Sequence, residues 1–215
     1  MKLPFFSLFT LLCTFATLAS AQEKTVIIFG DSITAGNAMA KEERGKAWPV
    51  LLADQTRGQL HVIAQGRAGR TTNSESDFKI VLAKVPKADI VVFALGTNDS
   101  NPQTDSVAPA VAHIKSMVEA ARAAYGPSLQ VLIIGPTNIN KDALQKRQET
   151  GAARSQRLKE INTAFETLAK EMRCDFLSLY DVVPASSLTN DGIHPDAAGN
   201  ALMVKAIQPR LLPAK

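Results

Sequence analysis

The sequence predicts an α/β fold, a three-layer α/β/α sandwich with a five-stranded parallel sheet. Five short apolar runs, rich in β-branched residues, do not alternate with polar residues, which is typical of strands buried on both faces of a sheet. Helical patterns lie between the runs, and strands that alternate with helices need crossover connections, which make the strands parallel. The runs are residues 25–29, 60–64, 90–95, 131–134 and 176–179.

The first 21 residues differ from the rest of the chain. Lys2 precedes an apolar stretch at 3–18, and small residues follow up to Ala21. This layout is typical of a secretory signal peptide, and the stretch is shorter than the about 20 residues of a membrane-spanning helix. We expect a signal peptide at 1–21, one domain at 22–215 and a secreted or periplasmic protein without stable membrane insertion after cleavage. An uncleaved membrane anchor is the alternative.

The first three runs are rich in β-branched and aromatic residues. Residues 25–29 read Thr-Val-Ile-Ile-Phe, residues 60–64 read Leu-His-Val-Ile-Ala, and residues 90–95 read Ile-Val-Val-Phe-Ala-Leu. β-Branched and aromatic residues favour strands. We therefore expect these runs to form strands of the sheet, like the two runs that follow them.

Two apolar stripes, with spacings of three and four residues, predict helices. The first consists of Val107, Val111, Ile114 and Val118. Its helix tolerates Pro109 only near the first turn. The second stripe predicts a helix from about 152 to 173 and consists of Leu158, Ile161, Phe165, Leu168 and Met172.

Residues 138–150 lie between the fourth strand and the last of these helices and carry no clear apolar stripe. A surface loop or the solvated start of the next helix is one interpretation. A mobile substrate-binding edge, acting as a lid, is the other.

Charge and cysteine content exclude two features. Cys13 lies in the predicted signal peptide, so Cys174 is the one cysteine left after cleavage and no intramolecular disulfide can form. The formal net charge of +4 falls to +3 when Lys2 is removed, and the chain has no basic run. Nucleic-acid binding therefore lacks an electrostatic basis.

Residues able to do chemistry follow the ends of the predicted strands. In an open parallel sheet, ligands bind outside the carboxyl ends of the strands. Together these segments supply a serine nucleophile, backbone donors, a side-chain amide and an acid–base pair. They are Gly30-Asp31-Ser32, residues 65–71, Gly96-Thr97-Asn98-Asp99, and residues 190–195.

Each segment alone also has an ordinary structural explanation. Asp31 or Ser32 could cap a helix, Gly69 could serve a tight turn, Asn98 could cap the next helix, and His194 could be a surface residue. The order and placement of all four segments favour a catalytic site.

The four segments resemble the SGNH hydrolase family, also called GDSL esterases and lipases, whose blocks carry Ser, Gly, Asn and His in this order. The matching residues are Ser32, Gly69, Asn98 and His194, with Asp191 three residues before the histidine. The resemblance extends from the first strand to Pro195. It implies a flavodoxin-like fold and an SGNH hydrolase domain at 22–215.

The resemblance also implies the role of each residue. His194 takes the proton of Ser32 through Nε2, because a serine hydroxyl is a poor nucleophile without a base. Asp191 accepts from Nδ1–H and stabilises the imidazolium. The backbone amides of Ser32 and Gly69 and the side-chain amide of Asn98 form an oxyanion hole.

Other catalytic motifs are missing from the sequence. It contains no Gly-x-Ser-x-Gly elbow, no His-Glu-x-x-His and no Gly-x-x-x-x-Gly-Lys. We therefore expect neither an α/β-hydrolase fold nor zinc or nucleotide chemistry, and no metal or organic cofactor.

Three further residues are candidates for substrate binding. Arg67 and Arg70 flank the block II glycine and could meet a negatively charged substrate, or they could be solvated without a ligand role. Trp48 could stack on a sugar, or it could pack in the core at the entry of a helix.

These observations predict a secreted serine esterase that hydrolyses short-chain esters through an acyl-enzyme on Ser32. Export among extracellular polymers, and the lack of a long apolar insertion, favour O-acetyl esters of carbohydrate over lipids. The expected partner is a small-molecule or carbohydrate ester. The alternatives are a lysophospholipase, thioesterase or arylesterase of the same family, and a non-catalytic carbohydrate-binding protein.

Overall fold

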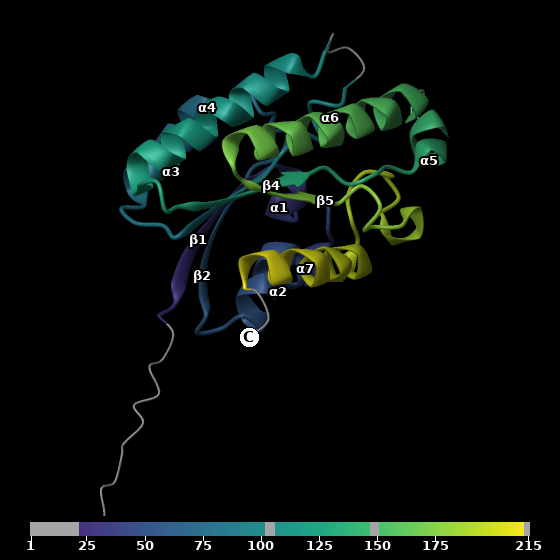
Figure 1. Ribbon diagram of the computed structural model, residues 1–215. Coiled ribbons are helices and arrows are strands. Elements are labelled where there is room, and N and C mark those ends of the chain that lie inside the picture. The colour runs from purple at the N-terminus through teal and green to yellow at the C-terminus, as the bar shows by residue number, and fades with distance from the viewer. Residues whose placement is uncertain (1–21, 102–105, 147–150, 213–215) are drawn as a thin grey trace, which may run out of the picture.

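The computed structural model describes residues 22–101, 106–146 and 151–212 (Figure 1). The predicted signal peptide lies outside the described residues, so it stays a prediction. The five strands form one sheet in the order β2-β1-β3-β4-β5, and every neighbouring pair is parallel. The predicted α/β fold and its five-stranded parallel sheet are confirmed.

The strands match the predicted apolar runs to within two residues at each end. They are β1 (Lys24–Gly30), β2 (Leu60–Gly66), β3 (Ile90–Ala94), β4 (Gln130–Gly135) and β5 (Asp175–Ser178). One expectation is wrong, because only the three inner strands are buried on both faces. The outer strands β2 and β5 are largely half-buried or exposed, since each has a neighbouring strand on one side only.

Helices cover both faces of the sheet, as Figure 1 shows, with α3, α4 and α6 on one face and α2 and α7 on the other. The helices are α1 (Ser32–Ala35), α2 (Trp48–Gln55), α3 (Glu75–Lys84), α4 (Ala108–Tyr125), α5 (Lys141–Lys146), α6 (Gly151–Met172) and α7 (Ala197–Leu211). Two short 3-10 helices, η1 (Lys41–Lys46) and η2 (Ala185–Ser187), complete the described elements.

Each face of the sheet has its own apolar core, because successive strand residues point to opposite faces. Ile27 and Phe29 of β1 pack with α3, α4 and α6. Val26 and Ile28 of the same strand pack with α2 and α7. The strands are thus held between two helical layers, which makes the three-layer sandwich.

Both predicted helical stripes are confirmed in outline. In α4, Ile114 and Val118 are buried and Pro109 lies in the first turn, where its missing N–H costs no helical hydrogen bond. In α6, four of the five stripe residues are buried, and Met172 at the end of the helix is partly buried.

The segment at 138–150 contains a short helix of its own, which the sequence did not predict. Leu144 of α5 is fully buried and packs with Ile139 and with Leu158 of α6. Residues 147–150 lie outside the described residues, so a role of this segment as a lid stays a prediction.

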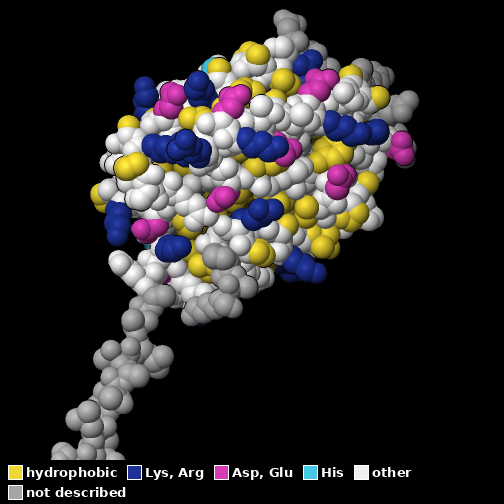
Figure 2. All heavy atoms as spheres, viewed as in Figure 1, with side chains coloured by type: hydrophobic (Ala, Val, Ile, Leu, Met, Phe, Trp, Pro, Cys, Tyr) yellow, Lys and Arg dark blue, Asp and Glu magenta, His cyan; other side chains and the backbone are white. Residues whose placement is uncertain are grey.

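The surface carries charges of both signs. Figure 2 shows lysine and arginine side chains spread over the visible face, with acidic side chains between them. Within the described ranges, no helix has the length and hydropathy needed to cross a membrane. Cys174 is a free thiol.

Candidate active site

The carboxyl ends of three neighbouring strands lie level with one another. Gly30, the last residue of β1, is in register with Gly66 of β2 and Ala94 of β3. The segments that follow these strands therefore start at the same edge of the sheet. Gly66 is required there, because a Cβ atom at this position would lie 2.4 Å from the backbone nitrogen of Ala35 in α1.

Ser32 is the first residue of α1, directly after β1. The buried Asp31 is the N-cap of this helix, and its Oδ1 accepts from the Ile33 amide at 2.9 Å. The helix begins at the strand end because a side-chain acceptor satisfies one of its first free amides. The Ser32 side chain is thereby carried to the carboxyl edge of the sheet.

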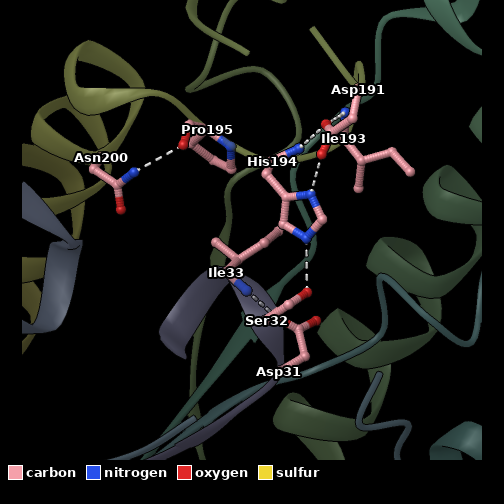
Figure 3. Close-up of polar contacts among 8 residues, drawn as sticks. All are labelled: Asp31, Ser32, Ile33, Asp191, Ile193, His194, Pro195 and Asn200. Atoms are coloured by element: carbon pink, nitrogen blue, oxygen red, sulfur yellow. Dashed lines mark hydrogen bonds and ion pairs between the residues drawn. The ribbon is translucent and has the colours of Figure 1, made fainter. Parts of the chain in front are cut away.

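Ser32, His194 and Asp191 form a continuous chain of hydrogen bonds (Figure 3). Ser32 Oγ lies 2.8 Å from His194 Nε2, and His194 Nδ1 lies 2.6 Å from Asp191 Oδ2. Because a carboxylate only accepts, this arrangement fits an imidazole that donates from Nδ1 and accepts the serine proton at Nε2.

Asp191 is held in its charged form by its surroundings. Burial acts to raise its pKa, but hydrogen bonds from the His194 and Ile193 amides and from the His194 ring together lower it to about 2. The two amides donate to Oδ1 at 3.0 and 2.8 Å. The carboxylate therefore stays ionised throughout the neutral pH range, where it can support a protonated imidazole.

The histidine segment is fixed by the neighbouring helix α7. Asn200 of this helix donates from Nδ2 to the carbonyl oxygens of Pro195 and Asp196 at 3.0 and 2.8 Å. Its Oδ1 accepts from the Trp48 amide at 2.9 Å. One buried side chain thus joins the His194 segment to α7 and to the start of α2.

The two other candidate oxyanion donors lie on adjoining segments. The amide of Asn98 donates to the Arg70 carbonyl at 2.9 Å, which leaves its second N–H for a further acceptor. Gly69, the residue before Arg70, has a φ of 71°, a left-handed conformation that favours glycine. The structure thus places the segment that contains Gly69 in contact with the segment that contains Asn98.

Asp99 supports this contact, a role that the sequence alone did not predict. Both carboxylate oxygens accept from the Thr72 amide, at 3.0 and 3.1 Å, and Oδ1 also accepts from the Thr72 hydroxyl. Asn98 does not cap the following helix, because α4 begins only at Ala108. The partner is 27 residues away in the chain, so no local spacing could reveal it.

Arg70 is not placed as a substrate ligand, which corrects one prediction. Its side chain is 7% exposed, donates to the carbonyl oxygens of Gly30 and Gln65, and lies 4.1 Å from the centre of the Phe29 ring. It holds the ends of β1 and β2 together. Arg67 is half exposed and forms an ion pair with Asp77 at 2.6 Å, so its role toward a substrate stays a prediction.

Trp48 is a second correction. Its side chain is fully buried, with 0% exposure, and belongs to the core beneath α2 and α7. A buried indole cannot stack on a sugar, so the core packing that was the alternative describes this residue.

The described ranges contain no group of three or more His, Cys, Asp or Glu side chains arranged to hold a metal ion. What the arrangement supplies is a serine with an adjacent base, a charged group that orients the base, and amide donors on neighbouring segments. These are the groups needed for acyl transfer.

Comparison with known proteins agrees with this chemistry. A sequence profile described as the GDSL-like Lipase/Acylhydrolase family matches residues 28–202. The human protein "Isoamyl acetate-hydrolyzing esterase 1 homolog" is 27% identical over 207 residues, which cover 86% of this chain and 79% of that protein.

Solved structures share the fold. A carbohydrate acetylesterase family member from Sinorhizobium meliloti is 25% identical, with a TM-score of 0.73 over 87% of this chain and 97% of that chain. The M. smegmatis aryl esterase is 22% identical, with a TM-score of 0.73 over 87% of this chain and 98% of that chain. The chain therefore belongs to the GDSL-like lipase/acylhydrolase family and is a hydrolase of carboxylic esters.

Proposed function

We propose that this protein is a serine esterase that removes short acyl groups, O-acetyl groups of carbohydrate in particular, through an acyl-enzyme on Ser32. The observation that carries the proposal is the hydrogen-bonded chain from Ser32 Oγ through the His194 ring to Asp191. A serine that only started a helix would not need a histidine at hydrogen-bonding distance.

In the first half-reaction, Ser32 Oγ attacks the ester carbonyl carbon while its proton passes to His194 Nε2. The oxyanion accepts hydrogen bonds from the Ser32 and Gly69 amides and from Asn98, and the Asp191 carboxylate stabilises the imidazolium. His194 then gives the proton to the departing alkoxide oxygen, which leaves as an alcohol.

In the second half-reaction, water replaces the alcohol. His194 Nε2 takes a proton from a water molecule, whose oxygen attacks the carbonyl carbon of the acyl-enzyme. Collapse of this second tetrahedral intermediate returns the proton to Ser32 Oγ and releases the carboxylic acid. No metal or organic cofactor takes part in this scheme.

The small size of the pocket beside the nucleophile supports short acyl groups. The pocket that contacts both Ser32 and His194 is also lined by Gly36, Ala38 and Met39, and its volume is about 10 Å³. This space has room for about one small group and not for an extended chain. Met39, which is 5% exposed, forms part of its wall.

The carbohydrate assignment and export are supported indirectly. The signal-peptide pattern at 1–21 would place the enzyme among extracellular polymers, and one similar structure is of a carbohydrate acetylesterase family member. Mass spectrometry of the protein from the culture medium or the periplasm should find Gln22 as its first residue. Protein retained in cells with Met1 intact would contradict export.

The catalytic proposal is tested with purified mature protein and 4-nitrophenyl acetate. Ser32→Ala should lower kcat by about 1,000-fold or more, because it removes the nucleophile. Ser116→Ala, at an exposed position of α4, is the matched control and should keep wild-type turnover. Equal activity of wild type and Ser32→Ala would contradict the proposal and favour the non-catalytic binding protein.

The acyl preference is tested by comparing 4-nitrophenyl acetate with 4-nitrophenyl octanoate, and acetylated oligosaccharides with lysophospholipids. Wild type should prefer the acetyl ester, whereas Met39→Ala should raise the octanoate-to-acetate ratio of kcat/KM by about tenfold, because it enlarges the pocket. A wild-type preference for octanoate or lysophospholipid would favour the lipid-directed alternatives, and one for aryl acetates over acetylated sugars would favour an arylesterase.

A further inference from the structure

A small cavity of about 20 Å³ lies next to the candidate active site. Its wall includes Asp31, Thr34, Trp48 and Thr137, each no more than 4% exposed. Apolar side chains from β4, α7 and the end of β3 complete it. A cavity of this volume has room for one water molecule.

Three polar atoms on residues that line the cavity have no hydrogen-bond partner in the part of the chain that the structure describes. They are Thr34 Oγ1, Trp48 Nε1 and Thr137 Oγ1, and all three are buried. A buried polar group without a partner costs free energy, and three in one small cavity indicate a shared partner. An indole N–H only donates, whereas hydroxyl groups both donate and accept, so that partner must do both as well.

Asp31 supplies the acceptor on the same wall. Its side chain is 2% exposed, and it accepts from the Ile33 amide at 2.9 Å and from the side chain of Thr97. A carboxylate has about four acceptor sites on its two oxygens. Two known donors therefore leave it able to accept from a water molecule in the cavity.

We propose that the cavity binds one water molecule that links the Trp48 indole N–H to the Asp31 carboxyl group, and that Asp31 is a positioning residue whose charge supports the protonated His194 during catalysis. The water accepts from the indole and donates to the carboxylate. The second half of this proposal rests on the proposed esterase function, whereas the first half does not.

Burial and the charged groups around Asp31 together place its change of protonation state near pH 6. Burial raises its pKa from 3.8 to about 6, although the Ile33 amide, the charge of His194 and Thr97 act in the opposite direction. Asp99 raises it further, and Arg70 also interacts with Asp31 electrostatically. In Figure 3, Asp31 lies beside Ser32, below the His194 ring.

Trp48 is the only tryptophan of the chain, so its indole N–H gives a single signal in a ¹H–¹⁵N NMR spectrum. We expect a cross-peak between this N–H and a long-lived water molecule, and a chemical shift that changes with pH around a midpoint near 6. Asp31→Asn keeps an oxygen for the α1 cap and should abolish the transition. His194→Gln should retain a transition, with a somewhat higher midpoint, because the electrostatic effect of His194 lowers the pKa of Asp31.

The first half of the proposal is overturned if the wild-type protein shows no water cross-peak. It is also overturned if the transition survives in Asp31→Asn or disappears in His194→Gln. The second half requires Asp31→Asn to lower kcat about tenfold at pH 7.5 with KM nearly unchanged, and an unchanged kcat would overturn it. The NMR experiment is repeated on Ser32→Ala, so a failure of the cavity proposal is distinguishable from a failure of the esterase proposal.

Discussion

Individual side chains at the candidate site act largely by holding one another in place. Asp191 orients His194, Asp99 binds Thr72, and the Arg70 carbonyl orients the Asn98 amide. An oxyanion donor contributes to catalysis only when it is already aimed at the position where negative charge develops. The residues that hold the donors therefore matter as much as the donors themselves.

Replacement of Asn98 tests this arrangement at the scale of one residue. Asn98→Ala should lower kcat on 4-nitrophenyl acetate by about 100-fold with little change in KM, because the donor acts on the transition state. Asn73→Ala, at an exposed asparagine, is the control and should have wild-type kinetics. A kcat for Asn98→Ala within twofold of wild type would exclude this amide from the oxyanion hole.

At the scale of elements, the site is assembled from a strand end, a helix start and the segment before α7. Asn200 connects the last of these to the rest of the fold, since its amide binds Pro195, Asp196 and the Trp48 amide. It is 2% exposed, and its hydrogen bonds to the Trp48 amide and the Pro195 carbonyl are buried. The position of His194 therefore depends on the packing of α7 against α2.

Asn200→Ala should lower the free energy of unfolding by about 2 to 4 kcal/mol, because it leaves buried backbone groups unpaired. It should also lower kcat, since the His194 segment loses its attachment to α7. Urea unfolding and esterase kinetics measure the two effects. Lys205→Ala, at an exposed position of the same helix, should change neither, and a stable Asn200→Ala with full activity would contradict this role.

At the scale of the whole molecule, the strand order β2-β1-β3-β4-β5 places the site between β1 and β3, whose connections run in opposite directions, from β1 to β2 and from β3 to β4. Such a switch point separates neighbouring connections and leaves a crevice at the carboxyl edge of the sheet. Ser32 follows β1, Gly69 follows β2 and Asn98 follows β3, so all three segments border this crevice. The fold itself thus brings together residues that are far apart in the chain.

The buried charge of Asp31 should also affect the stability of the whole fold. Its pKa is about 6 in the folded protein and about 3.9 in an unfolded chain. Above pH 6 the carboxylate is ionised in both states, and its burial disfavours the fold. As the pH falls from 6 toward 4, the folded protein binds the proton first, so the cost is relieved.

Asp31→Asn is uncharged at every pH and should therefore be more stable than wild type at pH 7.5, on the order of 2 kcal/mol. The difference should shrink as the pH is lowered to 4.5. Urea unfolding at pH 7.5, 6.0 and 4.5 measures it. A difference that is constant with pH, or of opposite sign at pH 7.5, would show that the Asp31 charge is not a net cost to the fold.

Local patterns in the sequence were sufficient for most of the fold. Continuous apolar runs predicted the strands within two residues, and stripes with helical spacing predicted α4 and α6, because both patterns follow from which faces are buried. The short helix α5 was not predicted, since Leu144 is held by Ile139 and Leu158 rather than by a stripe of its own.

The sequence by itself determined the candidate reacting groups, because Ser32, Asp191 and His194 stand in segments whose order is characteristic of one family. Only the tertiary structure decided which neighbouring side chains face the crevice. Arg70 and Trp48 have polar groups that suit a ligand, yet both side chains are buried. The Arg70 guanidinium donates to the carbonyl groups of Gly30 and Gln65. The Trp48 ring packs in the core with α2 and α7. The contacts of Asp99 with Thr72 and of Asn200 with the Trp48 amide likewise join residues far apart in the chain. The environment of such a residue depends on tertiary packing, which spacing along the sequence does not contain.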